Sequence, residues 1–133
     1  MKSMFLKQQC KQGGFMAVLN VVLHMDDPDD RRLGIGLTNL ENLIRAAGGP
    51  AHVNAHFVVN GPGVLLFREL AADFAERLFG LAEAGVHFVA CQNALRAKGM
   101  DVSELPLGMK TVPAGILELV RLQQEEGCAY IKP

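Results

Sequence analysis

The chain has 133 residues, 50% of them hydrophobic, and a formal net charge of -1 from 13 basic and 14 acidic side chains. This length suits one domain with one core, and the balanced charge, with no Trp and a single Tyr, argues against a nucleic-acid partner. The longest apolar runs, such as residues 16–23, are shorter than the roughly 18–20 residues that cross a bilayer, so no membrane segment is expected.

The first part of the chain differs from the rest. Residues 1–14 are polar and rich in Lys and Gln, and we interpret them as a flexible leader or extension, followed by a single domain over residues 15–133. The leader lacks the apolar stretch of a secretory signal, which favours a cytoplasmic location. Cys10, Cys91 and Cys128 are odd in number, widely spaced and without a C-x-x-C motif, so free thiols are expected rather than a disulfide framework or a structural zinc site. No cofactor is expected.

From residue 15 onward, strand and helix patterns alternate. Residues 15–24 are β-branched and almost continuously apolar, which predicts a strand buried on both faces that ends before Asp26-Asp27-Pro28. Residues 29–47 repeat Leu and Ile at three- and four-residue spacing and predict an amphipathic helix. The same criteria predict strands at 51–59, 86–90, 110–112 and 128–132, and helices at 64–84, 92–98 and 114–126.

This alternation predicts the fold class. Each connection between strands is long enough for a crossover, so we expect a three-layer α/β/α sandwich with a mostly parallel five-stranded sheet. Ligands bind such sheets at the carboxyl ends of the strands. The edge formed there is predicted to carry His24, Asp26, Asp27, Asn60 to Gly63, Cys91, Gln92, Asn93 and residues 113–115.

Cys91 is the strongest nucleophile at this predicted edge. It lies between a strand and a short helix, where backbone amides, and Arg96 or Lys98 if its side chain folds back, can stabilise a thiolate. The alternative is a small buried hydrophobic residue, because free cysteine is often found in cores. Cys128 falls at the opposite end of the sheet and is expected in the core.

The histidines and the glycine turn give weaker signals. His24 is adjacent to the acidic turn and is interpreted as a proton partner or as a hydrogen-bonded structural residue. His52 and His56 have a four-residue spacing, but in a strand they lie too far apart to hold one ion, so metal binding is not expected. The turn Gly61-Pro62-Gly63 lacks the features of a phosphate loop and suits a pocket wall.

Five segments, taken in order, resemble the DsrE/DsrF-like family of the sulfur-relay superfamily. The resemblance covers residue 15 to the C-terminus, and the segments are VVLHMDD at 21–27, NGPGV at 60–64, GVHFVACQNAL at 85–95, VPAG at 112–115 and AYIKP at 129–133. It implies an α/β/α domain, assembly into homotrimers or hexamers, and, by analogy with the sulfur-transferring members, a persulfide on Cys91. Two features depart from the family: the leader, and Ala94 where a hydroxyl residue is common.

Two functional hypotheses follow. In the first, Cys91 carries a sulfane sulfur between donor and acceptor proteins, Asn60 and Asn93 hold the terminal sulfur, and His24 assists proton movement. Gly61, Gly63 and Gln92 complete the predicted binding set. In the second, the protein is a homo-oligomeric module that binds a small ligand or a protein, and Cys91 is structural.

A flavodoxin-like nucleotide binder is disfavoured because no phosphate loop is present. The 20% charged residues and a mean hydropathy of +0.18 independently favour self-association.

Overall fold

The computed structural model describes residues 17–133, so the predicted leader and the first residues of the first predicted strand lie outside it. The elements follow in the order β1 (Leu19–Met25), α2 (Asp30–Ala46), η1 (Pro50–His52), β2 (Val53–Val59), η2 (Gly61–Phe67), α3 (Ala72–Glu83), β3 (His87–Cys91), α4 (Gln92–Ala97), η3 (Val102–Glu104), β4 (Met109–Val112), α5 (Gly115–Glu125) and β5 (Ala129–Ile131). The η elements are short 3₁₀ helices.

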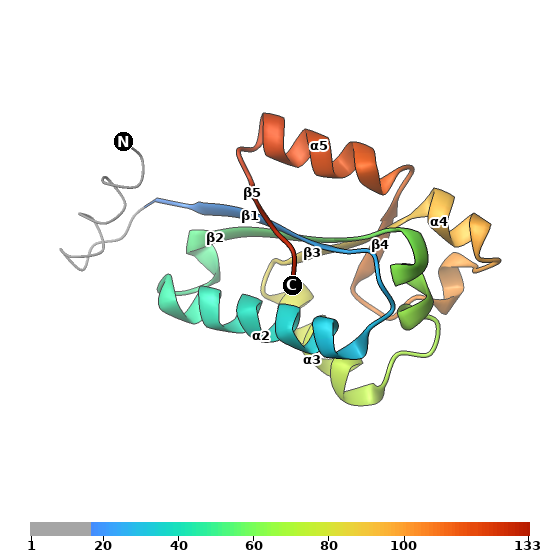
Figure 1. Ribbon diagram of the computed structural model, residues 1–133. Coiled ribbons are helices and arrows are strands. Elements are labelled where there is room, and N and C mark those ends of the chain that lie inside the picture. The colour runs from blue at the N-terminus through green and yellow to red at the C-terminus, as the bar shows by residue number, and fades with distance from the viewer. Residues whose placement is uncertain (1–16) are drawn as a thin grey trace.

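The strands form one sheet in the order β4-β3-β2-β1-β5, and every pairing between neighbouring strands is parallel. α2 and α3 cover one face of the sheet and α5 covers the other (Figure 1). The α/β class and the five-stranded sheet predicted from the sequence are therefore confirmed. No helix within residues 17–133 is long and apolar enough to cross a membrane.

The two faces of the sheet bury different kinds of side chain. The face below α2 and α3 holds the larger apolar cluster, which includes Phe57 and Phe88 in contact at a ring-centroid distance of 5.4 Å. The face below α5 holds a smaller cluster of Val22, Val58, Leu119, Leu122 and Cys128. On this second face the apolar cluster occupies the middle of the sheet, and polar residues lie toward both ends of the strands.

The prediction of one continuous helix over residues 64–84 is wrong for the residues before Ala72. Residues 61–67 form the 3₁₀ helix η2, and the α-helix begins only at Ala72. Val64 and Phe67 are both buried, and their three-residue spacing matches the three residues per turn of a 3₁₀ helix. The apolar residues of this segment are buried, as the pattern predicted, but they pack as a 3₁₀ helix rather than as the first turns of an α-helix.

Helix α2 offers a direct test of the core. Leu37 is fully buried, whereas Ile35 on the same helix is 52% exposed. Replacing Leu37 by Ala should lower the free energy of unfolding by about 2–5 kcal/mol, because a cavity remains where the side chain was. Ile35→Ala is the matched control and should change it by less than about 0.5 kcal/mol in urea denaturation. Equal effects would mean that α2 does not pack as described.

Candidate functional site

Three adjacent strands bring the predicted site residues to one edge. In the parallel register His24 pairs with Val58, and Val59 pairs with Ala90. His24, Asn60 and Cys91 therefore follow one another across β1, β2 and β3 near the carboxyl ends of these strands. Because side chains alternate along a strand, all three belong to the face that α5 covers.

His24 is held by two hydrogen bonds. Its Nε2 lies 2.8 Å from the Asn60 Oδ1, and its Nδ1 lies 2.5 Å from the Tyr130 hydroxyl. An amide oxygen only accepts, so Nε2 carries a proton toward Asn60, and in the neutral imidazole Nδ1 accepts from Tyr130. His24 is buried. Tyr130 lies on β5, and nothing in the AYIKP segment indicates a role for it; only the β1–β5 pairing brings it next to His24.

Cys91 ends β3 and caps the N-terminus of α4. Its Sγ accepts a hydrogen bond from the backbone N–H of Ala94 at 3.4 Å. The amide at position 94 supplies this contact whatever the side chain is, so the Ala in place of a hydroxyl residue leaves it intact. Cys91 is only 6% exposed, and the thiol is free. The site thus presents a sheltered sulfur atom with one N–H donor already directed at it.

Gly115, the first residue of α5, lies directly against this edge. A Cβ atom added there would lie 2.9 Å from the Asn60 Cβ and 3.2 Å from the Cys91 Cβ. Only a residue without a side chain lets the helix start so close to both strands. Residues 113–115 were predicted at this edge from the sequence, but the close approach at Gly115 becomes visible only in the packed structure.

The other predicted binding residues do not converge on the thiol. The Gln92 side-chain amide donates to the Thr111 hydroxyl on β4 at 2.9 Å. The Asn93 side chain is exposed and accepts from Arg96 in its own helix.

The predicted glycines support the edge through the backbone. A Cβ at Gly63 would lie 2.9 Å from the Met25 carbonyl oxygen, and Gly61 has a φ of +55°. The Asn60 N–H also donates to the Met25 carbonyl at 3.1 Å. The turn therefore packs against the end of β1, and this close approach positions Asn60.

The C-terminal residues close the edge beside His24. The Lys132 ammonium group lies 2.8 Å from the Asp26 carboxylate and lowers the pKa of that carboxyl group below its ordinary value. The Arg32 guanidinium donates to the Pro133 carbonyl at 2.8 Å. These side chains and His24 line a cavity of about 330 Å³. A small polar ligand entering it would meet charges of both signs.

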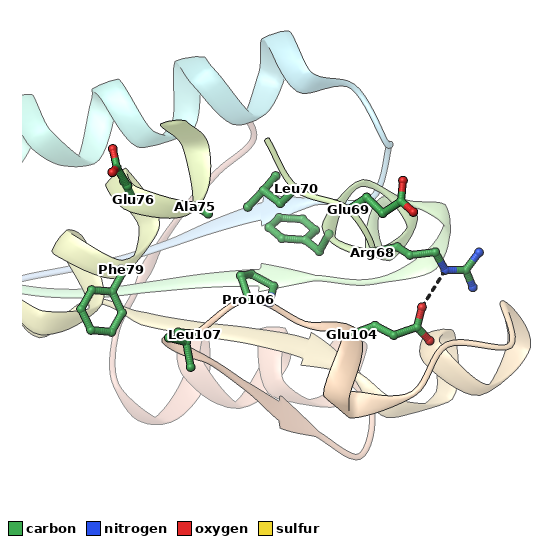
Figure 2. A pocket seen from close by; sticks show the side chains of 10 residues that line it. Arg68, Glu69, Leu70, Ala75, Glu76, Phe79, Glu104, Pro106 and Leu107 are labelled. Carbon is green, nitrogen blue, oxygen red and sulfur yellow. Dashed lines mark hydrogen bonds and ion pairs between the residues drawn. The ribbon is translucent and has the colours of Figure 1, made fainter. Parts of the chain in front are cut away.

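A second, larger groove lies on the side of the sheet that α3 covers, away from Cys91. This groove of about 550 Å³ runs between the η2–α3 connection and the segment before β4 (Figure 2). Its lining is mainly apolar, with Phe67, Leu70, Phe79 and Leu107, and an Arg68–Glu104 ion pair of 3.1 Å closes one end. No cysteine or histidine among residues 17–133 lines this groove, which lies apart from the candidate site.

Comparison with known proteins identifies the family. The family model described as DsrE/DsrF-like family matches residues 17–133. The chain belongs to the DsrE/DsrF-like family. A solved structure of a protein of unknown function from Methanobacterium thermoautotrophicum, MTH1491, shares 35% sequence identity with it and superposes with a TM-score of 0.75, covering 86% of this chain and 99% of that one.

A more distant structure shares the fold alone. The conserved protein of unknown function BT1422 from Bacteroides thetaiotaomicron is 14% identical, with a TM-score of 0.64 and coverage of 86% of this chain and 95% of that one. No curated protein matches the chain. Membership of the DsrE/DsrF-like family confirms the resemblance stated from the sequence and associates the fold with sulfur relay.

The close approach of Gly115 can be tested by a single methyl group. Gly115→Ala should destabilise the protein by about 1–3 kcal/mol, because Asn60 and Cys91 must give way. Gly80→Ala in α3 is the matched control: a Cβ there meets nothing within 4 Å, so helix propensity should raise stability by up to about 1 kcal/mol. Thermal and urea unfolding measure both, and a neutral Gly115→Ala would contradict the tight contact.

Proposed function

We propose that this DsrE/DsrF-like protein is a sulfur carrier that holds a persulfide on Cys91. The observation that carries the proposal is the position of the Cys91 Sγ at the end of β3, where it accepts the N–H of Ala94 at 3.4 Å. The family association with sulfur relay supports the same reading. Free thiols also favour a reducing compartment, so the cytoplasm remains the expected location.

The transfer step is a thiol exchange. The Cys91 thiolate attacks the outer sulfur of a donor persulfide, R–S–SH; the donor S–S bond breaks, RS⁻ leaves, and Cys91 becomes Cys–S–SH. An acceptor thiolate then takes the same outer sulfur and regenerates the Cys91 thiolate. Asn60 directly follows the neighbouring strand β2 and accepts a hydrogen bond from the His24 Nε2 at 2.8 Å, and His24, which also contacts the Tyr130 hydroxyl, is the side chain assigned to proton exchange at this edge.

Gln92 and Asn93 were predicted from the sequence to contact the sulfur, but in this proposal they act indirectly. Their side chains bond to Thr111 and Arg96 rather than turning toward the sulfur. They fix the start of α4, and so the direction of the Ala94 N–H. We therefore assign the contacts to the carried sulfur to backbone amides and Asn60, with Gly61 and Gly63 shaping the adjacent wall.

Two cysteines with the same exposure provide a matched test of loading. Cys91 and Cys128 are each 6% exposed, but they lie at opposite ends of the sheet. In a Cys10→Ser background, incubation with polysulfide should add the mass of one sulfur atom at Cys91. Cys91→Ser should abolish the gain and Cys128→Ser should retain it, as peptide mass mapping will show. Unchanged loading in Cys91→Ser would refute the proposal.

The burial of Cys91 favours a second candidate, a non-catalytic binding module in which the thiol only packs. Alkylation of the folded protein separates the two. A carrier thiol reacts in the native state, faster with small reagents than with bulky ones, whereas a packed thiol reacts only after unfolding. Native reactivity of Cys91 well above that of Cys128 supports the carrier, and equal inertness of both supports the binding module.

We also propose that the carrier is a homo-oligomer, a trimer or hexamer, that meets donor and acceptor proteins. The outer surface of α5 exposes Ile116, Leu117 and Val120, the first two at 64% each. β5 is an edge strand whose residues are all exposed. An apolar helix surface and a free strand edge are both features that association covers.

Sedimentation tests this assembly. The double substitution Ile116→Glu and Leu117→Glu should reduce the mass in solution toward that of a 14.4 kDa monomer, because charges would be buried without partners. Leu107→Glu, at a residue 79% exposed on the apolar groove, is the control and should leave the mass unchanged. A monomeric parent protein at micromolar concentration would contradict the proposal.

A further inference from the structure

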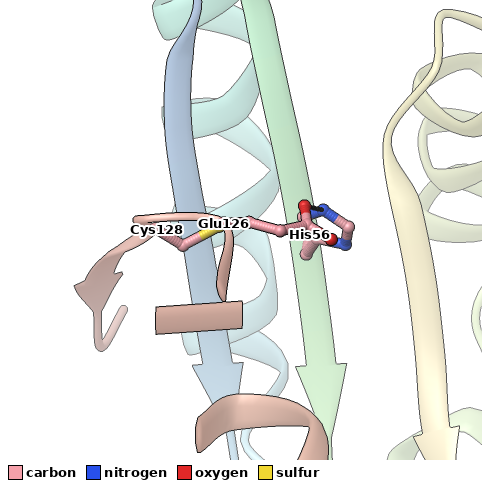
Figure 3. Close-up of side chains that lie close together, drawn as sticks. All are labelled: His56, Glu126 and Cys128. Atoms are coloured by element: carbon pink, nitrogen blue, oxygen red, sulfur yellow. Dashed lines mark ion pairs between the residues drawn. The ribbon is translucent and has the colours of Figure 1, made fainter. Parts of the chain in front are cut away.

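A second group of reactive side chains lies on the α5 face, toward the opposite end of the sheet from the Cys91 edge. His56 comes from β2, Glu126 follows the last turn of α5, and Cys128 precedes β5 (Figure 3). One ligand atom of each lies within 4.8 Å of the other two, and the His56 Nε2 is 3.4 Å from the Glu126 Oε1. His56 and Cys128 are buried, while the Glu126 side chain is 34% exposed.

The end of α5 explains why these residues meet. Gly127 has a φ of +66°, and the backbone N–H groups of Glu126 and Cys128 both donate to the Leu122 carbonyl, at 3.2 and 3.1 Å. This reversal brings Glu126 and Cys128 to the same end of the helix. The parallel pairing of Ala129 with Val21 then holds Cys128 against the sheet.

An imidazole, a thiolate and a carboxylate together suit a borderline divalent cation such as zinc better than magnesium or calcium. Tetrahedral zinc, with bonds of about 2.0–2.1 Å to nitrogen and oxygen, places those two atoms about 3.3 Å apart. The observed 3.4 Å between His56 and Glu126 matches this spacing. The same geometry places a thiolate sulfur about 3.6 Å from the other two ligand atoms, so the Cys128 Sγ, which lies within 4.8 Å of both, needs to approach by at most about 1.2 Å.

We propose that His56, Glu126 and Cys128 form a binding site for zinc or a similar divalent cation, with water or a small ligand as the fourth donor. Metal binding was not expected from the sequence, because His52 and His56 lie too far apart along a strand and the cysteines lack the spacing of a structural zinc site. This site uses only one of those histidines and takes its other two ligands from the α5–β5 turn. It is independent of the sulfur chemistry proposed for Cys91.

The side chains around the site leave room for an ion, but some of their hydrogen bonds would be lost when it binds. Asn54 donates to the Glu126 Oε1 at 3.1 Å, and its own Oδ1 lies 3.1 Å from the His56 Nε2, so an ion must displace both contacts. Arg121 bonds the other oxygen, Oε2, at 3.1 Å and can continue to orient the carboxylate from outside the site. The ring of His87 stacks on His56 at 4.7 Å and limits its rotation.

The protonation states of His56 and Cys128 determine whether metal binding releases a proton. Burial, with His87 second, lowers the pKa of His56, which keeps the imidazole neutral near pH 7. Burial and the charge of Glu126 raise the pKa of the Cys128 thiol. Binding therefore requires the His56 ring proton to move from Nε2 to Nδ1, and it converts Cys–SH and a divalent cation into a metal thiolate and one released proton, with no change of oxidation state.

Cobalt(II) is a suitable probe because a thiolate ligand gives it a near-ultraviolet charge-transfer band and tetrahedral coordination gives visible bands. The full chain is used as a Cys10→Ser variant without an affinity tag. One cobalt per chain should bind and produce both bands, and zinc should displace it and raise the unfolding temperature. Cys128→Ser should lose the charge-transfer band, and His56→Gln and Glu126→Gln should weaken affinity by more than about tenfold.

Cys91→Ser and His52→Gln are the matched controls and should keep the bands, because neither residue belongs to the proposed ligand set. The proposal is overturned if the parent chain shows no charge-transfer band, or if the band survives Cys128→Ser and disappears in Cys91→Ser. It is also overturned if His52→Gln weakens binding as much as His56→Gln. Should the buried substitutions prevent folding, the parent spectrum together with Glu126→Gln, at a partly exposed residue, still decides the result.

Discussion

The parallel pairing of β1, β2 and β3 is the constraint on which the rest of the structure depends. β1 and β2 pair continuously from Leu19–Val53 to Met25–Val59, and β3 continues the same register. Parallel strands end at the same edge, so the His24, Asn60 and Cys91 side chains become neighbours although they are far apart in the sequence. A shift of register by one residue would turn each strand's polar side chains to the opposite face.

The difference between the two faces of the sheet explains why chemistry gathers under α5. The face under α2 and α3 is packed with large apolar side chains and has little room for polar groups. Within residues 17–133 a single helix, α5, covers the other face, and the apolar cluster beneath it occupies only the centre. Polar groups therefore occur at both ends of α5: the Cys91 edge at its start, and His56, Glu126 and Cys128 at its end.

The two ends of α5 are set by glycines in different ways. Gly115 allows a close approach because it has no Cβ, which brings the helix start onto Asn60 and Cys91. Gly127 allows a left-handed backbone conformation, which turns the chain back and returns Cys128 to the sheet. One helix thereby runs from one end of the sheet to the other.

The candidate site was predictable only in part. Cys91 could be placed after a strand because residues 86–90 are apolar and the next segment is helical, and both inferences depend on local sequence alone. The roles of Tyr130 and Gly115 were not predictable, since they arise from contacts between elements more than 20 residues apart in sequence. Gln92 and Asn93 were expected at the thiol because they are adjacent to it, yet their side chains follow the helix and bond to Thr111 and Arg96.

The amino-acid sequence by itself determined the fold class, the order of the strands and helices along the chain, and the family, because these depend on periodicity, turn residues and motifs in order. The tertiary structure alone decided how tightly the segment at 61–67 is wound, which polar side chains meet under α5, and how sheltered the Cys91 sulfur is. The physical reason is that hydrophobic patterning sets which face of an element is buried, whereas hydrogen-bond partners and steric contacts depend on the neighbour that packing brings to it.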